Sequence, residues 1–457
     1  MSELSRSLKP RHLAMISIGG IIGAGLFVSS SAAIAAAGPA IVLSYLITGT
    51  LVLLVMRMLG EMAVAMPKIR SFTDFPRAGL GPWAGFVGGW LYWYFWVITG
   101  PVEAIAGANI LHQWFPGLSL LVLGLGLMAV MTGVNLMSAR SYGEFEFWFS
   151  SIKVAAIIVF IALAGAYAFG LTSPTGQTFG NLTSHGGFMP QGFVAVLAGA
   201  VTVFFSLTGA EITTVAAAES SEPTKAVARM STSVIVRILT FYVGSILLIV
   251  AVVPWDSVKV GESPFARALM TMHFGWATMA MSAIVLTAVL SCLNSAFYVC
   301  SRVLFVLAEH GDAPQGLVRL NSRKVPVNSV LMSALAGVLG IIAETQAPQA
   351  VFAFLVNASG ALIVFVYMMV IVAQIRLRRE RERTGVPAPA VQMWLFPWAS
   401  YAAIAGMVTV LVAMAFTGMA KDLYASLATL VIAFVADRKS TRLNSSHQCL
   451  SRMPSSA

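Results

Sequence analysis

The stretch Ser17-Ile-Gly-Gly-Ile-Ile-Gly-Ala-Gly-Leu-Phe27 lies in the first apolar segment of the chain and decides the fold. Each of its four glycines weakens a helix by about 1 kcal/mol relative to alanine. We therefore expect a break inside a membrane-spanning helix. A break exposes backbone N–H groups that suit a carboxylate, and it frees carbonyls that can hold an ammonium group or a cation. In a bilayer, such backbone persists only where it lines a cavity or a ligand site.

Two other interpretations of the same glycines are open at this point. Gly19 and Gly23 have the spacing of a motif with which membrane helices pack closely against each other. The glycine spacing also has a weak likeness to a dinucleotide-binding loop, but that loop follows a β-strand, and none precedes this apolar segment. The helix break and the packing motif therefore remain in competition.

The composition places the whole chain in a membrane. Of its 457 residues, 58% are apolar and 10% are charged, whereas soluble domains carry about 25% charged residues. Apolar segments of helical length recur along the chain. We predict twelve membrane spans, at residues 13–36, 39–66, 83–110, 119–137, 148–171, 192–218, 233–254, 275–305, 328–344, 349–374, 395–417 and 421–437.

The positive charges set the expected topology. With the N-terminus inside, almost all Lys and Arg residues fall in cytoplasmic segments, and only Lys259, Arg267 and Lys421 lie on the opposite side. A cleaved signal peptide would remove the first span and invert this bias, so we expect an uncleaved, multi-pass protein. We place it in the inner (plasma) membrane of a bacterium. The basic residues thus mark topology and do not indicate a nucleic-acid partner.

A second irregularity interrupts span 6, where the sequence reads Phe204-Phe-Ser-Leu-Thr-Gly-Ala-Glu211. Broken helices five spans apart, an odd number of crossings, are typical of transporters built from inverted repeats. We predict an all-α transporter domain over residues 1–437. Its parts are repeat one (13–171), repeat two (192–374) and two further helices (395–437).

The end of the chain departs from this pattern. The apolar segment stops at 437, and the polar string that follows resembles the translation of a sequencing-library adapter. We predict that residues 438–457 are a non-native tail that cuts the last span short. A genuine short polar tail is the alternative.

Three ionisable residues lie well inside predicted spans: Glu103, Lys153 and Glu211. A charge at the centre of a membrane helix costs about 2.5–3.5 kcal/mol on insertion scales, so a role in function is the default hypothesis. Glu211, beside the second break, could carry a proton. Buried structural ion pairs are the alternative for all three. Arg57 and Glu61 stand four residues apart near the end of span 2, and there we expect a structural pair.

The chain resembles the amino acid permeases of the amino acid–polyamine–organocation superfamily, most closely the bacterial γ-aminobutyrate (GABA) permeases. The likeness runs from about residue 8 to 436. It is carried by Gly20-Ile-Ile-Gly-Ala-Gly-Leu-Phe27, Arg57-Met-Leu-Gly-Glu-Met-Ala-Val-Ala65, Gly89-Trp-Leu-Tyr-Trp93, Tyr142-Gly-Glu-Phe-Glu-Phe-Trp148, Gly209-Ala-Glu211 and Ser291-Cys-Leu-Asn-Ser-Ala-Phe-Tyr298.

The resemblance implies the LeuT-type fold, a 5+5 inverted repeat with helices 1 and 6 broken, followed by two helices. It also implies a substrate site at the two breaks. The substrate carboxylate would bind backbone near Gly23, Ala24 and Gly25. The amino group would meet carbonyls near Ile21, and span 6 would contribute Phe205, Thr208 and Gly209.

The resemblance further implies proton-coupled uptake that depends on Glu103, Lys153 and Glu211, with Lys153 where sodium-coupled relatives hold their cation. We expect an importer of GABA or another small neutral amino acid, with protons as the coupling ion and no cofactor or metal. An amino acid exchanger and an amino acid sensor are the alternatives. An enzyme is not expected, because no nucleophile–base pair is evident. The sequence Ile98-Thr-Gly-Pro-Val-Glu103 differs from that of the GABA permeases around the acidic residue. Which amino acid is transported therefore stays open.

Overall fold

The computed structural model describes residues 11–12, 15–16, 22–67, 69, 72–137, 139–212, 238–344 and 348–451. The α-helices within these ranges are α2 (Ser30–Ala37), α3 (Ile41–Ala65), α4 (Asp74–Leu80), α5 (Pro82–Trp114), α6 (Leu120–Asn135), α7 (Ala139–Ala168), α8 (Asn181–Ser184), α9 (Gly192–Leu207), α12 (Ser245–Val252), α13 (Pro264–Thr271), α14 (Gly275–Glu309), α15 (Val327–Glu344), α16 (Pro348–Arg383), α17 (Trp398–Ala415) and α18 (Ala420–Ser451). Short π or 3₁₀ segments join them: η1 (Gly25–Ser29), η2 (Gly38–Ala40), η3 (Ile238–Gly244), η4 (Trp255–Ser257) and η5 (Gln315–Val318).

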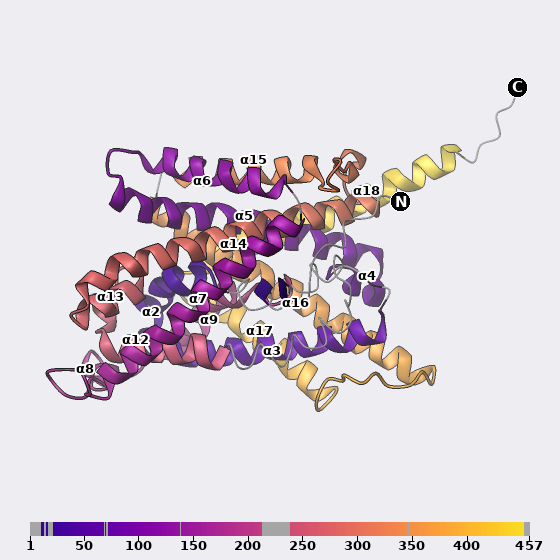
Figure 1. The fold of residues 1–457 in the computed structure, drawn as a ribbon. Helices are drawn as coiled ribbons and strands as arrows, with labels where there is room; N and C mark the ends of the chain where they lie inside the picture. Colours follow the sequence, from indigo (N-terminus) through magenta and orange to yellow (C-terminus); the bar gives the residue numbers. More distant parts are fainter. Residues whose placement is uncertain are drawn as a thin grey trace, which may run out of the picture.

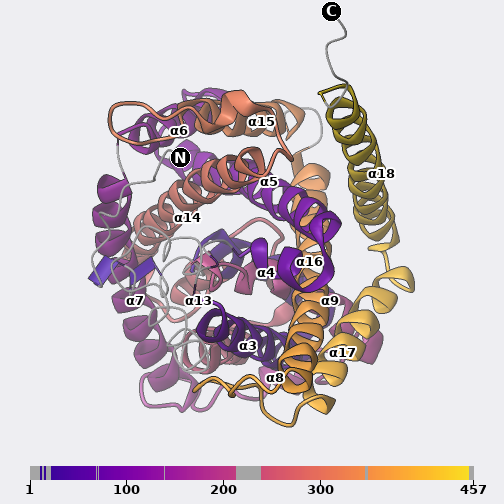
Figure 2. The same ribbon diagram turned by 90° about the vertical axis from the view of Figure 1, so that its right-hand side faces the viewer.

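The long helices form one bundle, with α4 at one end and α8 at the other (Figure 1). Helix α14 packs along α5 and α7, and α9 packs against α2, α3 and α16. Helices α6 and α15 lie side by side on one flank, and α18 runs along the outer edge in the end-on view of Figure 2. Residues distant in sequence thus meet around α5, α9 and α14.

Apolar helices account for the predicted spans. Six helical segments in the described ranges are long and apolar enough to cross a membrane, at 25–65, 82–114, 142–168, 275–309, 351–383 and 398–415. The first of these contains η1, α2, η2 and α3, and so covers the second half of span 1 and all but the last residue of span 2. Shorter apolar helices match spans 4, 6, 7 and 9, and span 12 lies within α18.

Helices α7 and α16 are among those that extend beyond the predicted spans. Helix α7 begins at Ala139 rather than at 148, and α16 continues to Arg383 rather than ending at 374. The extension of α16 is rich in Arg and Glu, and ion pairs one turn apart support it: Arg378–Glu382 at 2.9 Å and Arg383–Glu380 at 2.8 Å. The predicted span 10 ended at 374 and left these arginines between spans 10 and 11, whereas the structure places them on α16.

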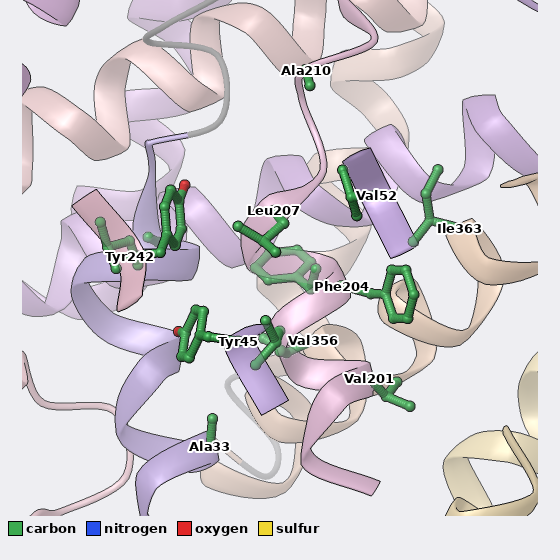
Figure 3. Packing of buried hydrophobic residues seen from close by; sticks show 14 of the residues in the cluster. Ala33, Tyr45, Val52, Val201, Phe204, Leu207, Ala210, Tyr242, Val356 and Ile363 are labelled. Carbon is green, nitrogen blue, oxygen red and sulfur yellow. The ribbon is translucent and has the colours of Figure 1, made fainter. Parts of the chain in front are cut away.

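Each predicted helix break falls in part on described residues; Gly19 and Gly20 of the first break lie outside them. After the first break, the helix of span 1 resumes at Ala24 and passes through the π-helical η1 into α2. In span 6, α9 ends at Leu207, Thr208 is extended (ψ 142°), and Gly209 has φ 126°, a region that favours glycine. Figure 3 shows the chain leaving α9 at Leu207 and continuing as a loop to Ala210.

Close packing fixes α9 within the bundle. Buried side chains from α2, α3 and α16, among them Ala33, Tyr45 and Val356, surround its second half (Figure 3). Against α16 the backbones nearly touch, because a Cβ on Gly360 would lie 2.1 Å from the carbonyl oxygen of Val201. Only glycine fits at that crossing.

The last helix does not stop at the predicted end of span 12. The backbone of α18 continues through residues 438–451. The origin of residues 438–457 and the bounds of the two repeats stay predictions.

Candidate functional site

The first break is held by a carboxylate. The backbone N–H of Ala24 donates to both carboxylate oxygens of Glu103, at 3.1 Å each. Glu103 comes from α5 and is buried. Because Ala24 begins the second half-helix of span 1, Glu103 occupies the position at which the helix dipole favours an anion.

Lys153 holds the other side of the same break. Its Nζ donates to the carbonyl oxygen of Ile22 and to Oγ of Ser291, both at 2.8 Å. It also pairs with Glu146 at 3.6 Å, and the side chains of both residues are fully buried. A lysine and a glutamate buried in a bilayer stabilise each other only through such pairing. Lys153 therefore links α7, α14 and the broken helix.

The two breaks meet at a backbone crossing. Ser206 Oγ donates to the carbonyl oxygen of Gly25 at 2.7 Å, and Tyr242 Oη donates to the carbonyl oxygen of Ser206 at 3.1 Å. A Cβ on Gly25 would lie 2.6 Å from the Cα of Ser206. Glycine is therefore needed at position 25 for span 1 and span 6 to approach this closely.

A small cavity lies between the breaks. Its volume is about 10 Å³, roughly the space of one water molecule. Aromatic rings form part of its wall: Phe95, Trp96 and Phe205. The remaining lining residues are Gly23, Gly25, Thr99, Glu103, Ser206, Thr208 and Cys292. Among the described residues of this lining, Glu103 is thus the one with a charged side chain.

Glu211 lies at the second break with its own donors. Its carboxylate accepts hydrogen bonds from the Gly209 N–H at 3.1 Å, Tyr92 Oη at 3.2 Å and Tyr367 Oη at 2.9 Å. Tyr92 belongs to α5 and Tyr367 to α16, and both are buried. Glu211 thus ties the extended segment after α9 to two neighbouring helices.

The structure brings most of the sequence-predicted residues together. Gly23, Gly25, Glu103, Phe205 and Thr208 line one cavity. Ala24 and Lys153 contact the break beside it, whereas Gly209 and Glu211 lie one step along the span-6 segment and are not in the cavity lining. Ile21 lies outside the described residues.

Cys292 and Glu146 were not predicted as site residues from the sequence. Cys292 lines the cavity, and both its Cβ and its Sγ lie within 3.0 Å of where a Cβ on Gly23 would be. Glu146 pairs with Lys153. Both residues stand in segments that carry the family resemblance, and position within those segments was the available signal.

The expected pair between Arg57 and Glu61 was wrong. Glu61 instead binds Arg381 at 2.9 Å and Arg378 at 3.5 Å, both from the extension of α16. Arg57 donates to the carbonyl oxygen of Gln392 at 2.8 Å. Because the two arginines on the extension of α16 reach Glu61, they neutralise its carboxylate in place of Arg57.

A cluster of ionisable side chains connects α4 with the residues that follow α14. Arg77 pairs with Asp312, and Asp74 lies 3.9 Å from Arg77 and 3.8 Å from His310. Burial raises the pKa of Asp74 above its usual value. His310 and Arg77 act against this shift, and Asp312 adds to it. We call these four residues the α4 cluster.

The arrangement of the helices is that of a known fold. The fold is similar to a solved nucleobase–cation-symport-1 family transporter in a closed conformation with bromovinylhydantoin bound. The TM-score is 0.57 at 16% sequence identity, covering 97% of this chain and 94% of that one. Together with the two broken helices, this similarity confirms the predicted LeuT-type fold.

The chain belongs to the amino acid permease family, whose sequence profile matches residues 12–436. It is 45% identical to a γ-aminobutyric acid permease of Bacillus subtilis over 424 residues, which is 92% of this chain and 90% of that relative. It is 44% identical to a γ-aminobutyric acid permease of Escherichia coli over 417 residues, covering 91% and 89%. The family and these relatives are transporters rather than enzymes.

Proposed function

We propose that this permease imports a small neutral amino acid together with protons, with GABA as the first substrate to test. Two relatives at 44–45% identity are named as γ-aminobutyric acid permeases. We also propose that it lies in a bacterial plasma membrane with a cytoplasmic N-terminus, as the distribution of Lys and Arg favours. On that orientation, the α4 end of the bundle is cytoplasmic.

The bond between Glu103 and Ala24 is the observation on which the proton coupling rests. A substrate carboxylate that binds the span-1 break needs the backbone N–H of Ala24. In this structure that N–H donates a hydrogen bond to Glu103 at 3.1 Å. Two carboxylates at one site repel each other, so one of them must lose its charge or leave. Protonation of Glu103 removes its charge and releases the N–H. Substrate binding and proton binding therefore favour each other.

The cavity wall supports a small neutral cargo. Three aromatic rings restrict the space, and hydroxyl groups of Thr99, Ser206 and Thr208 supply polar contacts. Since the described residues of the cavity lining include no cationic side chain, a second acidic group on the substrate would find no partner among them. A short amino acid with an uncharged body fits this chemistry.

Lys153 and Glu211 have different proposed tasks. Lys153 bonds to the carbonyl oxygen of Ile22, so loss of its charge would release the first half of the broken helix. Glu211 accepts hydrogen bonds from two tyrosines and a backbone N–H at the second break. We propose that it couples protonation to movement of span 6.

An exchanger that swaps amino acids without net proton movement is the second candidate, and a sensor on the same fold is the third. An exchanger would use the same two breaks but would need no titrating residue in the cavity. Glu103 lines the cavity and binds the first break, where we propose that the substrate carboxylate binds, and this position favours the symporter. A sensor would bind amino acid without moving it.

The decisive experiment measures how amino acid binding depends on pH in the parent and in Glu103→Gln. In the parent, GABA should bind more tightly as the pH falls, because bound substrate requires protonated Glu103. The variant cannot be ionised at this position, so its affinity should change with pH much less than that of the parent. A parent-like pH dependence in Glu103→Gln would overturn the proposed coupling.

Uptake into proteoliposomes then separates the candidates. A panel of labelled amino acids is tested with an inward proton gradient, with a protonophore, and with internal unlabelled substrate. Accumulation that needs the gradient supports the symporter. Uptake that needs internal substrate and ignores the gradient supports the exchanger, and binding without any uptake supports the sensor.

A further inference from the structure

Glu146 is a buried carboxylate outside the substrate cavity. It lies seven residues before Lys153 on α7, which is about 10 Å along the helix axis. Its oxygens accept hydrogen bonds from Ser291 at 2.7 Å, from Ser150 at 2.9 Å and from Ser295 at 3.4 Å. The serines at 291 and 295 come from α14, so Glu146 joins the two helices.

Ser291 stands between Lys153 and Glu146 with a defined direction. Its oxygen accepts from Lys153 Nζ at 2.8 Å. Its single hydroxyl proton is donated to Glu146 at 2.7 Å. An ammonium donor, a hydroxyl and a carboxylate acceptor are thus hydrogen-bonded in series. This order is what a one-step relay of a proton requires.

We propose that Glu146 accepts the proton that Lys153 releases during the transport cycle. The ammonium of Lys153 gives a proton to Ser291 Oγ while the hydroxyl proton of Ser291 passes to Glu146. The products are a neutral lysine, an unchanged serine and a protonated Glu146, so charge and atoms balance. This role rests on the proposed proton coupling, and it assigns the proton a path through Glu146.

The path leads away from the substrate. Within the described part of the chain, neither Ser291 nor Glu146 lines the cavity. Beyond Glu146, Ser295 is hydrogen-bonded to Tyr142 Oη at 3.1 Å, one turn nearer the start of α7. On the proposed orientation that direction is cytoplasmic. A proton on this path would reach the cytoplasmic half without crossing the substrate.

Several other ionisable groups face this path. From α7 these are Lys153 and Tyr142. From α14 they are Cys292, which interacts electrostatically with Glu146, and Arg302, which interacts electrostatically with Tyr142 and stacks on Tyr298 at 4.1 Å. Glu103 of α5 acts on Lys153 from the cavity side. Within this set, only Glu146 is joined to Lys153 through a hydroxyl that accepts from the lysine and donates onward.

A buried structural ion pair is the competing role for Glu146. The two roles differ in what they require of substrate exchange, because exchange at equal pH moves substrate without releasing the proton from Lys153. A relay residue is needed for proton-driven accumulation and not for exchange. A structural residue is needed for both.

The test compares Glu146→Gln with Glu144→Gln in proteoliposomes. Glu144 lies on the same helix, is 34% exposed and pairs with Arg11, so it is a matched control. We expect Glu146→Gln to exchange GABA as the control does but to lose gradient-driven accumulation by about a hundredfold, the lower end for a positioned proton-transfer group. Glu146→Asp should recover part of the accumulation.

Ser291→Ala gives an independent measurement if Glu146→Gln does not fold. It removes the bridging hydroxyl and leaves both ionisable groups, and the same split between exchange and accumulation is expected. Gradient-driven accumulation by Glu146→Gln at the control level would overturn the relay, as would equal loss of exchange and accumulation in folded protein. A parent that ignores the proton gradient would instead refute the proposed coupling, and the relay with it.

Discussion

Replacement of Gly25 by alanine tests the crossing of the two broken helices. The added Cβ would lie 2.6 Å from Ser206 Cα and 3.2 Å from Ser206 Oγ. The closest atom belongs to the backbone, so no side-chain rotation relieves the contact. Ordinary contact begins at 3.4 Å, so the two segments must separate by about 0.8 Å, the difference between 3.4 and 2.6 Å.

The cost of this separation sets the expected size of the effect. Overpacking a well-packed site costs about 1–3 kcal/mol. The cost applies only to the state in which the breaks touch, so the variant should shift the population away from that state by about 5–150-fold. If substrate binds the state in which the breaks touch, its dissociation constant should rise by a similar factor.

The assay is GABA binding and initial uptake, measured for Gly25→Ala beside Gly126→Ala. Gly126 lies in α6, and a Cβ there would meet nothing within 4 Å. The control should match the parent or gain slightly from the better helix propensity of alanine. Affinity and uptake in Gly25→Ala equal to those of Gly126→Ala would refute the close crossing.

Three further predictions concern charged residues. Glu211→Gln should abolish proton-driven uptake, because an amide cannot take up the proton and its NH₂ group, which replaces one of the two acceptor oxygens, accepts no hydrogen bond; a variant that accumulates substrate as the parent does removes the proton-carrier role. Lys153→Ala should impair coupling, and an unchanged pH dependence of uptake would exclude Lys153 from the mechanism. Burial raises the pKa of Asp74, so folded protein holds that proton more tightly than the unfolded chain does, and stability is lost as pH rises from the unfolded-state value through the folded-state value. Asp74→Asn should lack this loss, and melting temperatures that fall with pH as steeply as the parent's would contradict it.

The sequence predicted the membrane spans and the three intramembrane charges for one reason. A bilayer penalises charge and unsatisfied backbone strongly, so residues such as Glu103 and Lys153 stand out in an apolar segment. The same argument found the span-6 break at Thr208 and Gly209, where polar residues and a glycine interrupt the helix.

Contacts between residues that are distant in the sequence were less predictable. Glu61 was predicted to pair with Arg57, one turn away, but its partners are Arg378 and Arg381. These arginines lie on the extension of α16, whose charged sequence does not continue the apolar pattern of the span. Glu146 escaped notice because α7 begins before the apolar segment does. That Glu103 would face the N–H of Ala24 depends on how α5 packs against the first break, which no local pattern encodes.

The bond between Glu103 and Ala24 has a consequence for the half of the cycle in which no cargo moves. Net accumulation requires the empty carrier to return across the membrane. In the proposed mechanism, the Glu103 carboxylate acts then as an internal surrogate, filling the helix end that the cargo's carboxylate fills during import. An obligate exchanger stalls without cargo on both sides, whereas a carrier with its own surrogate can reset and take up the next molecule.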